Sequence, residues 1–226
     1  MLQQPPAAMR FKERIREFFQ QHSRIAETIS IGRRENVYTS GDQNQKIYII
    51  DSGRVKLIMN SPAGKDCLLA IYTSGDVFGE LCLAGLGDRL ETATAMVDTI
   101  LKQVSCSTFH SSLSDDSLSD SFVQYLVVRI AEQQQIIAGL MTVDSEHRLG
   151  EALLMLARKF GKQSAHGIRI EHKITHEDLS EMIGTTRPWI SRLLHKFREL
   201  GLIEICPKRF LTIKEEKLNA YLAEIV

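Results

Sequence analysis

The residues best suited to act on another molecule lie between Gly184 and Lys214. This segment carries seven basic and two acidic side chains, a local balance of +5. Two of its arginines, Arg187 and Arg192, fall near the start of a predicted helix. An arginine there can donate two hydrogen bonds to O6 and N7 of guanine in the major groove of DNA. The segment therefore predicts a surface that meets a polyanion, with DNA as the favoured partner.

The sequence around these arginines has the pattern of two helices joined by a tight turn. Thr175 can cap a first helix that stops at Gly184, and Thr185 or Thr186 can cap a second helix that tolerates Pro188 in its first turn. The inward stripe predicted for the second helix consists of Ile190, Leu193, Leu194, Phe197 and Leu200. The opposite face then presents Arg187, Pro188, Ser191, Arg192 and His195. This is the pattern of a helix-turn-helix.

Two short strands, predicted over 202–206 and 210–213, follow the second helix and form a wing. Lys208 and Arg209 lie at its tip, where they can meet phosphate. A helical hairpin in an ordinary core could share the apolar spacing, but it would have little reason to expose two arginines beside a basic wing. The predicted DNA-binding residues are Thr175, Thr185, Thr186, Arg187, Pro188, Ser191, Arg192, His195, Lys208 and Arg209.

A long helix, predicted over 122–142, is the first element that must position this segment. Its apolar stripe consists of Val123, Leu126, Ile130, Ile137 and Leu140, with Gln133 as the one polar member. Such a stripe suits a two-stranded parallel coiled coil between subunits, and a helix lying on the strands of its own chain is the alternative. Residues 111–121 are a Ser/Asp-rich break that cannot bury much, with a helix cap expected at Ser119, Asp120 or Ser121.

The remaining elements are predicted from the period of the apolar residues. An amphipathic helix over 10–25 opens the chain, and from 31 to about 104 the apolar residues alternate in short runs separated by Gly/Asp turns. These runs predict a compact antiparallel barrel or roll, and hence an α+β fold. A second helix over 145–160 ends at Gly161 and precedes a polar loop over 162–167.

Composition bounds the class of protein. The 226 residues include 28 basic and 28 acidic side chains, and charges interrupt every apolar run before it could cross a bilayer. Residues 1–20 lack an uncharged apolar block, so no secretory signal is expected and the location is predicted to be cytoplasmic. Four cysteines without a CxxC pair disfavour a disulfide framework and a zinc ribbon, and no metal ligands are predicted. No recognisable motif pairs a nucleophile with a base, so an enzyme is not expected.

Nearly the whole chain resembles the CRP/FNR family of bacterial transcription regulators. The matching strings are DSGRVKL, GDVFGEL, RLGEALLMLA and ITHEDLSEMIGTTRPWISRLLHKFRELGLIE. The resemblance implies a cyclic-nucleotide-binding-like β-roll over 1–120, a dimerisation helix over 121–144 and a winged-helix DNA-binding domain over 145–226. It also implies a homodimer, a palindromic operator on double-stranded DNA and contact with RNA polymerase, for which the 162–167 loop is the corresponding surface.

The resemblance assigns roles to individual residues in the recognition helix. The family's base-reading arginines fall on Arg187 and Arg192. Many relatives have between them a glutamate that reads cytosine, and here that position is Pro188, which cannot accept a hydrogen bond from a base. We therefore expect a half-site that differs from the usual one at this base pair.

The resemblance also identifies an effector site and casts doubt on its usual ligand. Gly79 and Glu80 match the pair that holds the ribose of a cyclic nucleotide. The following string, LETA, puts Glu91 at or next to the position of the arginine that neutralises the phosphate, with Thr92 beside it. A carboxylate about 4 Å from a phosphate costs about 4 kcal/mol at an effective dielectric of about 20. This cost is about three orders of magnitude in affinity, so cAMP in its usual pose is disfavoured.

Three further residues complete the predicted effector site. Arg89 could compensate for Glu91 only if the loop follows a different path, and Gln133 and Gln134 align with the pair that meets the purine. The predicted site therefore contains Gly79, Glu80, Arg89, Glu91, Thr92, Gln133 and Gln134. An iron–sulfur cluster is not expected because no cysteine precedes Cys67, and Cys82 is either a redox switch or a core residue.

Two other functions remain open from the sequence. One is a constitutive DNA-binding regulator whose roll serves only as a dimer scaffold. The other is a nucleotide-binding regulatory protein without DNA affinity, which Arg187 and Arg192 argue against. We expect a homodimeric transcription regulator in which a nucleotide-type effector in the roll reorients the two recognition helices.

Overall fold

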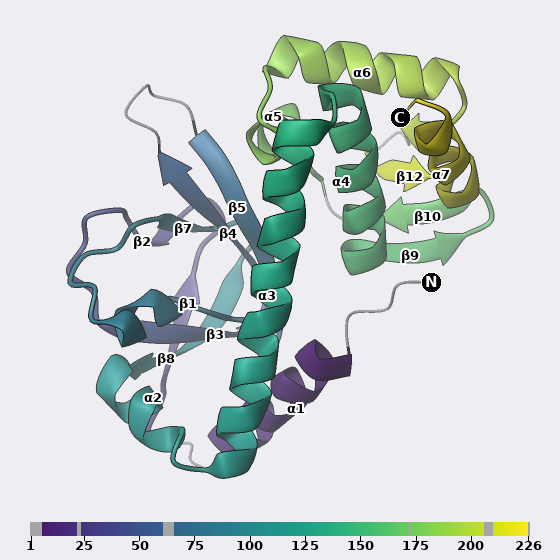
Figure 1. Cartoon of the computed structure of the whole chain (residues 1–226). Helices are drawn as coiled ribbons and strands as arrows, with labels where there is room; N and C mark the ends of the chain where they lie inside the picture. The colour runs from purple at the N-terminus through teal and green to yellow at the C-terminus, as the bar shows by residue number, and fades with distance from the viewer. Residues whose placement is uncertain (1–5, 22–23, 61–65, 172, 206–209, 226) are drawn as a thin grey trace. The chain divides into compact units, whose positions relative to one another are not determined.

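The computed structural model describes residues 6–21, 24–60, 66–171, 173–205 and 210–225. Contacts between residues divide the chain into two units, residues 5–131 and residues 132–226 with 1–4, and each unit is described by itself. The elements are labelled in Figure 1. Within the described ranges, none of the helices has both the length and the apolar character needed to span a bilayer.

The first unit is a β-roll with helices on one side. Its elements are α1 (Pro6–Gln21), β1 (Glu27–Ile31), β2 (Asn36–Tyr38), β3 (Lys46–Ser52), β4 (Arg54–Asn60), β5 (Asp66–Thr73), β6 (Val77–Phe78), η1 (Glu80–Ala84), β7 (Thr92–Ala95), β8 (Thr99–Ser105), α2 (Cys106–Ser112) and the start of α3 (Asp116–Thr142). The strands form two antiparallel sheets, in the orders β1-β8-β3-β6 and β2-β7-β4-β5. The predicted antiparallel roll is confirmed.

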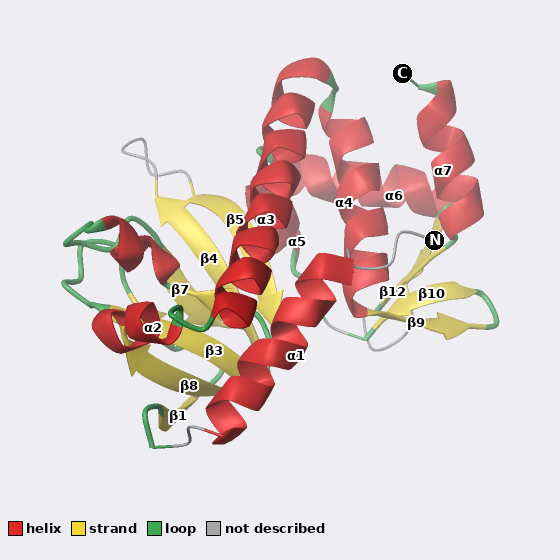
Figure 2. Ribbon diagram, turned by 60° about the horizontal axis from the view of Figure 1, so that its bottom comes forward, coloured by secondary structure: helices red, strands yellow, loops and turns green. Residues whose placement is uncertain are grey.

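Alternation along β3 shows how the sequence builds this unit. Tyr48 and Ile50 point into the cluster between the two sheets, whereas Ile47 and Ile49 belong to a second cluster shared with the helices. Residues from α1, α2 and α3 complete this second cluster, and Figure 2 shows α1 lying alongside α3. Strand β3 is therefore buried on both faces.

The segment predicted as a Ser/Asp-rich break is mostly helical, so that prediction is wrong. Helix α2 ends at Ser112 and α3 begins at Asp116, ahead of the predicted start at 122. The caps expected at residues 119–121 are also wrong, because the Asp115 carboxylate accepts the backbone N–H groups of Ser117 and Leu118 at 2.9 and 3.0 Å. Leu118 is buried in the core cluster that the helices share, although the segment around it is mostly polar.

The second unit contains the end of α3 and a small sheet surrounded by helices. Its elements are α4 (Ser145–Phe160), β9 (Gly161–Ser164), β10 (Gly167–Ile170), α5 (His176–Ile183), α6 (Arg187–Glu199), β11 (Ile203–Ile205), β12 (Leu211–Ile213) and α7 (Glu215–Glu224). The strands pair antiparallel in the order β11-β12-β10-β9. Together, the two units give the predicted α+β fold class.

Helix α4 has the bounds that its periodicity predicts, and the Asp144 carboxylate caps it by accepting His147 N–H at 2.8 Å. The polar loop predicted over 162–167 is instead a hairpin, because β9 pairs with β10. Helix α7 was missed by the sequence analysis. Its Leu222 packs so closely on α4 that a Cβ on Gly150 would lie 2.5 Å from it, which explains the glycine there.

Candidate DNA interface and effector site

Helix α5 and the turn after it are fixed by local hydrogen bonds. The Thr175 hydroxyl accepts Asp178 N–H at 3.0 Å, and the Asp178 carboxylate accepts Thr175 N–H at 3.0 Å, which is a complete capping box. The helix ends at Gly184, whose φ of 68° is unfavourable for other residues. Thr175 is confirmed as the cap of α5, and its hydroxyl is hydrogen-bonded to Asp178.

Helix α6 begins after Thr186, which occupies the cap position without a side-chain hydrogen bond. Thr185 donates its backbone N–H to Ser180 O at 3.0 Å, so this residue closes the turn. Pro188 lies in the first turn, as predicted. Four members of the predicted inward stripe are buried: Ile190, Leu193, Leu194 and Phe197. The prediction is wrong for Leu200, which is 49% exposed because the helix has ended before it.

The outward face of α6 presents the predicted residues to solvent. All five are exposed: Arg187, Pro188, Ser191, Arg192 and His195. The Arg187 guanidinium lies 3.8 Å from the Glu177 carboxylate, and Ser191 Oγ lies 2.8 Å from His176 Nδ1. The Arg192 guanidinium lies 6.0 Å from the ring of Trp189, which is itself exposed. The sequence analysis missed His176 and Trp189, although Trp189 directly follows Pro188.

The position of α6 is held by ionic contacts to the rest of the unit. Lys196 Nζ lies 2.7 Å from the Glu146 carboxylate of α4, which also accepts a hydrogen bond from the Tyr221 hydroxyl. The strands β11 and β12 follow α6 as the predicted wing. The predicted tip residues Lys208 and Arg209 lie outside the described residues.

Helix α3 exposes an apolar stripe that differs from the predicted one. With Gln134 as the polar member, the exposed apolar residues at alternating spacings of four and three are Val123, Val127, Ile130, Ile137 and Met141. Leu126 packs against the core of the roll and is not part of this stripe, whereas the predicted member Leu140 is 41% exposed and lies beside Met141. The polar position in the stripe is therefore Gln134 rather than Gln133. The alternative, a helix packed on its own strands, holds only for the opposite face of α3.

Arg89 in the roll is tied to the backbone. Gly79 has a left-handed φ of 82°, and its carbonyl accepts a hydrogen bond from Arg89 Nη1 at 2.7 Å. Arg89 Nη2 donates to the carbonyl of Lys46. The side chain is buried, and its Nε has no partner among the described residues. Arg89 therefore braces the turn at Gly79.

Glu91 is buried beside Arg89, and only one of its two carboxylate oxygens has a hydrogen-bond partner among the described residues. The Tyr38 hydroxyl donates to Glu91 Oε1 at 2.8 Å, whereas Glu91 Oε2 has no partner among the described residues. The Arg89 guanidinium lies 4.2 Å from the centre of the Tyr38 ring. Burial and the adjacent Glu91 carboxylate raise the pKa of Tyr38, so the phenol keeps its proton. Tyr38 was missed by the sequence analysis.

Glu80 faces α3 through an ion pair. Its carboxylate lies 2.6 Å from Arg129 Nη1, and Arg129 also donates to the Tyr72 hydroxyl. Thr92 Oγ1 accepts Ser40 N–H at 3.1 Å. Gly79, Glu80, Arg89, Glu91 and Thr92 all belong to the roll.

Gln133 and Gln134 are exposed on the part of α3 that belongs to the second unit. Their place in the effector site stays a prediction. Arg129, the α3 residue that contacts this region, was missed by the sequence analysis.

This combination of parts defines a class of protein. A β-roll with a half-satisfied buried carboxylate is followed by a long helix with an exposed apolar stripe and by a winged helix-turn-helix. Residues 28–116 match the cyclic nucleotide-binding domain family, and residues 147–221 match the Crp-like helix-turn-helix domain family. The chain is a DNA-binding transcription regulator with an effector-binding domain.

Relatives identify the family. The global nitrogen regulator of Synechococcus elongatus is 33% identical over 180 residues, which cover 78% of this chain and 81% of that protein. A CRP-like cAMP-activated global transcriptional regulator of Mycobacterium tuberculosis is 28% identical, covering 84% and 85%. The chain belongs to the CRP/FNR family, whose members typically act as dimers.

Solved structures show the same fold. A variant of CooA from Carboxydothermus hydrogenoformans superposes with a TM-score of 0.78 at 25% identity, covering 91% of this chain and 94% of that one. The c-di-GMP-responsive regulator CLP from Xanthomonas campestris superposes with a TM-score of 0.76 at 19% identity, covering 88% and 98%. The second likeness concerns the fold alone.

Proposed function

We propose that two copies of this chain pair along α3 and insert their α6 helices into successive major grooves of a palindromic operator. The observation that carries the proposal is the outward face of α6, where Arg187 and Arg192 are exposed next to a rigidly capped turn. A two-fold axis between the protomers requires two inverted half-sites about 34 Å apart. The protein acts by binding rather than by catalysis.

The proposed location and second partner follow from this role. A regulator of bacterial promoters acts in the cytoplasm, where it meets RNA polymerase. The β9-β10 turn, which replaces the predicted 162–167 loop, is the proposed polymerase contact. Transcription in vitro from a promoter carrying the operator tests this contact, and activation that is lost when the turn is shortened would support it.

A binding-site selection from random duplexes tests the proposed DNA-binding mode. We expect inverted repeats in which the base pair between the two arginine-read positions departs from the half-site usual in this family. The physical reason is that Pro188 has no side-chain acceptor for a cytosine amino group. The Pro188→Glu variant is the matched control, and it should shift the selection towards the usual half-site. Recovery of that usual half-site with the unaltered protein would contradict the prediction.

We further propose that the effector is not cAMP bound in the pose usual for this family. Glu91 supports this proposal, because it is buried in the roll and the family resemblance puts it at or next to the position that neutralises the phosphate. Removing the charge with Glu91→Gln should tighten cAMP binding by up to about a thousandfold. Isothermal titration of both proteins measures the difference, with Glu13→Gln on the exposed side of α1 as the control. Equal affinities for cAMP in wild type and Glu91→Gln would overturn the proposal.

A second function is favoured by the way the roll interior is filled. Arg89 is bound to backbone carbonyls, Glu91 is bound by Tyr38, and the rings of Tyr38, Tyr48 and Phe78 pack together. A roll interior filled by its own side chains suits a constitutive DNA-binding regulator. Operator affinity that stays constant over a panel of cyclic mononucleotides and cyclic dinucleotides supports this second function.

A further inference from the structure

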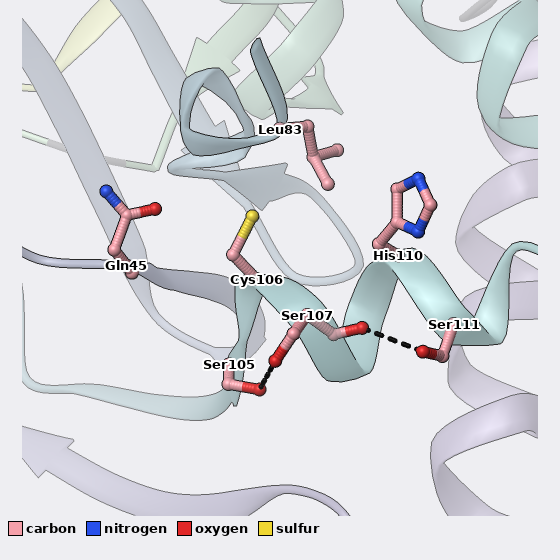
Figure 3. Close-up of a pocket in the computed structure, with 7 residues that line it drawn as sticks. All are labelled: Gln45, Leu83, Ser105, Cys106, Ser107, His110 and Ser111. Carbon is pink, nitrogen blue, oxygen red and sulfur yellow. Dashed lines mark hydrogen bonds between the residues drawn. The ribbon is translucent and has the colours of Figure 1, made fainter. Parts of the chain in front are cut away.

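The roll contains a hollow whose lining does not include Glu91. It has a volume of about 600 Å³, and Leu83 of η1 lines it together with Cys106 and His110 of α2. Figure 3 shows the sulfur of Cys106 pointing toward the ribbon that carries Leu83. Because the hollow opens to solvent, a small reagent can reach this sulfur.

A second cysteine lies against the first. Cys82 is the residue before Leu83, and its side chain is buried in the core cluster against which Cys106 packs. The helices η1 and α2, which carry the two cysteines, contact each other, and neither thiol forms a disulfide in this structure. The two cysteines therefore lie on helices that contact each other, and Cys106 lines the hollow.

We propose that Cys82 and Cys106 are an oxidisable thiol pair that a hydroperoxide converts to an intramolecular disulfide. The thiolate of Cys106 attacks the terminal oxygen of the hydroperoxide, the O–O bond breaks, and Cys106 becomes a sulfenic acid while an alcohol or water leaves. The Cys82 sulfur then attacks the sulfenic sulfur, and its proton leaves with the hydroxyl group as water. Two electrons pass from the thiols to the hydroperoxide, which balances the reaction.

The environments of the two thiols set the order of these steps. Burial and the adjacent Cys106 raise the pKa of the Cys82 thiol to about 12. A thiol with so high a pKa is a poor first nucleophile. Cys106 is half-buried and lines the hollow, where a small reagent can reach it. Cys106 therefore reacts first, and Cys82 resolves the intermediate.

A disulfide at this position would act on α3. The short helix η1 that carries Cys82 begins with Glu80, whose carboxylate holds Arg129 of α3 at 2.6 Å. A covalent tie between Cys82 and Cys106 changes the freedom of the segment on which this ion pair depends. The regulatory effect rests on the proposed function, because it is measured as a change in operator affinity.

The chemical step is tested on the full chain carrying Cys67→Ser and Cys206→Ser, which removes the other two thiols. After treatment with hydrogen peroxide, we expect the loss of both remaining thiols and a peptide that links Cys82 to Cys106 within one chain. Adding Cys82→Ala should stop the reaction at a Cys106 sulfenic acid, trapped by dimedone. Adding Cys106→Ser instead should leave Cys82 unmodified. Thiols that stay titratable, or a disulfide that joins two chains, would overturn the proposal.

The regulatory step is tested with the same proteins on an operator duplex. Oxidation should change operator affinity by about fivefold or more, reversibly with dithiothreitol, and Cys82→Ala should abolish the response. If the disulfide forms and operator affinity does not change, the coupling to α3 is wrong. If the reduced protein does not bind an operator at all, the proposed function fails while the thiol chemistry stands.

Discussion

Replacement of both Arg187 and Arg192 by alanine is expected to abolish specific operator binding. Each bidentate contact to guanine is worth roughly 1–3 kcal/mol, so two contacts amount to about one to four orders of magnitude in affinity. Fluorescence anisotropy with operator and unrelated duplexes measures the effect. Affinity for the operator should fall to that for unrelated DNA.

The double replacement should leave the fold intact. Arg187 and Arg192 are exposed, and substitutions at such positions usually change stability by no more than about 0.5 kcal/mol. Arg198→Ala is the matched control, because Arg198 is an exposed arginine at the opposite end of the same helix. Its loss should weaken binding to both duplexes slightly and leave their ratio unchanged. Operator affinity of the double variant equal to that of wild type would contradict the proposed DNA-binding mode.

The helix-turn-helix could be predicted from the sequence because its signals are local. Thr175 and Asp178 are three residues apart and form the capping box by themselves, and Gly184 adopts the backbone angle that its residue type favours. The same local reasoning places Pro188 in the first turn of α6. It fails at Leu200, since the residue that continues a helical period can lie beyond the helix end.

The effector region could not be predicted in the same way because its partners are far apart in the sequence. Tyr38 and Glu91 are 53 residues apart, and Glu80 and Arg129 are 49 residues apart. A motif can identify Glu91 as unusual, but only the packing of β2 against β7 brings the Tyr38 hydroxyl to it. Cys106 was overlooked for this reason as well, since its neighbour Cys82 lies on another element.

The exposed stripe of α3 shows a different limit of prediction from sequence. Spacings of three and four are satisfied by Val123 with Leu126 and equally by Val123 with Val127. Periodicity alone cannot choose between these two stripes, because both fit a heptad. The choice is made by tertiary packing, which takes Leu126 into the roll and leaves Val127 exposed.

Replacement of Ile130 and Ile137 by aspartate is expected to give a folded monomer. Both side chains are more than half exposed in the single chain, at 53% and 61%, so they contribute little to its own core. In a coiled coil, each buried isoleucine contributes roughly 1.5–3 kcal/mol, and each variant dimer loses four of them. Dimer dissociation should therefore rise by at least about four orders of magnitude, as sedimentation equilibrium would measure.

Monomerisation should also weaken operator binding severely, because two half-site contacts no longer act as one ligand. Gln135→Glu is the matched control, since it adds a charge to α3 at an exposed position outside the stripe. The control should remain dimeric and bind the operator as wild type does. Circular dichroism should show unchanged helix content in both proteins. A dimer that persists after the double aspartate replacement would show that the protomers pair through a surface other than the stripe of Val123, Val127, Ile130, Ile137 and Met141.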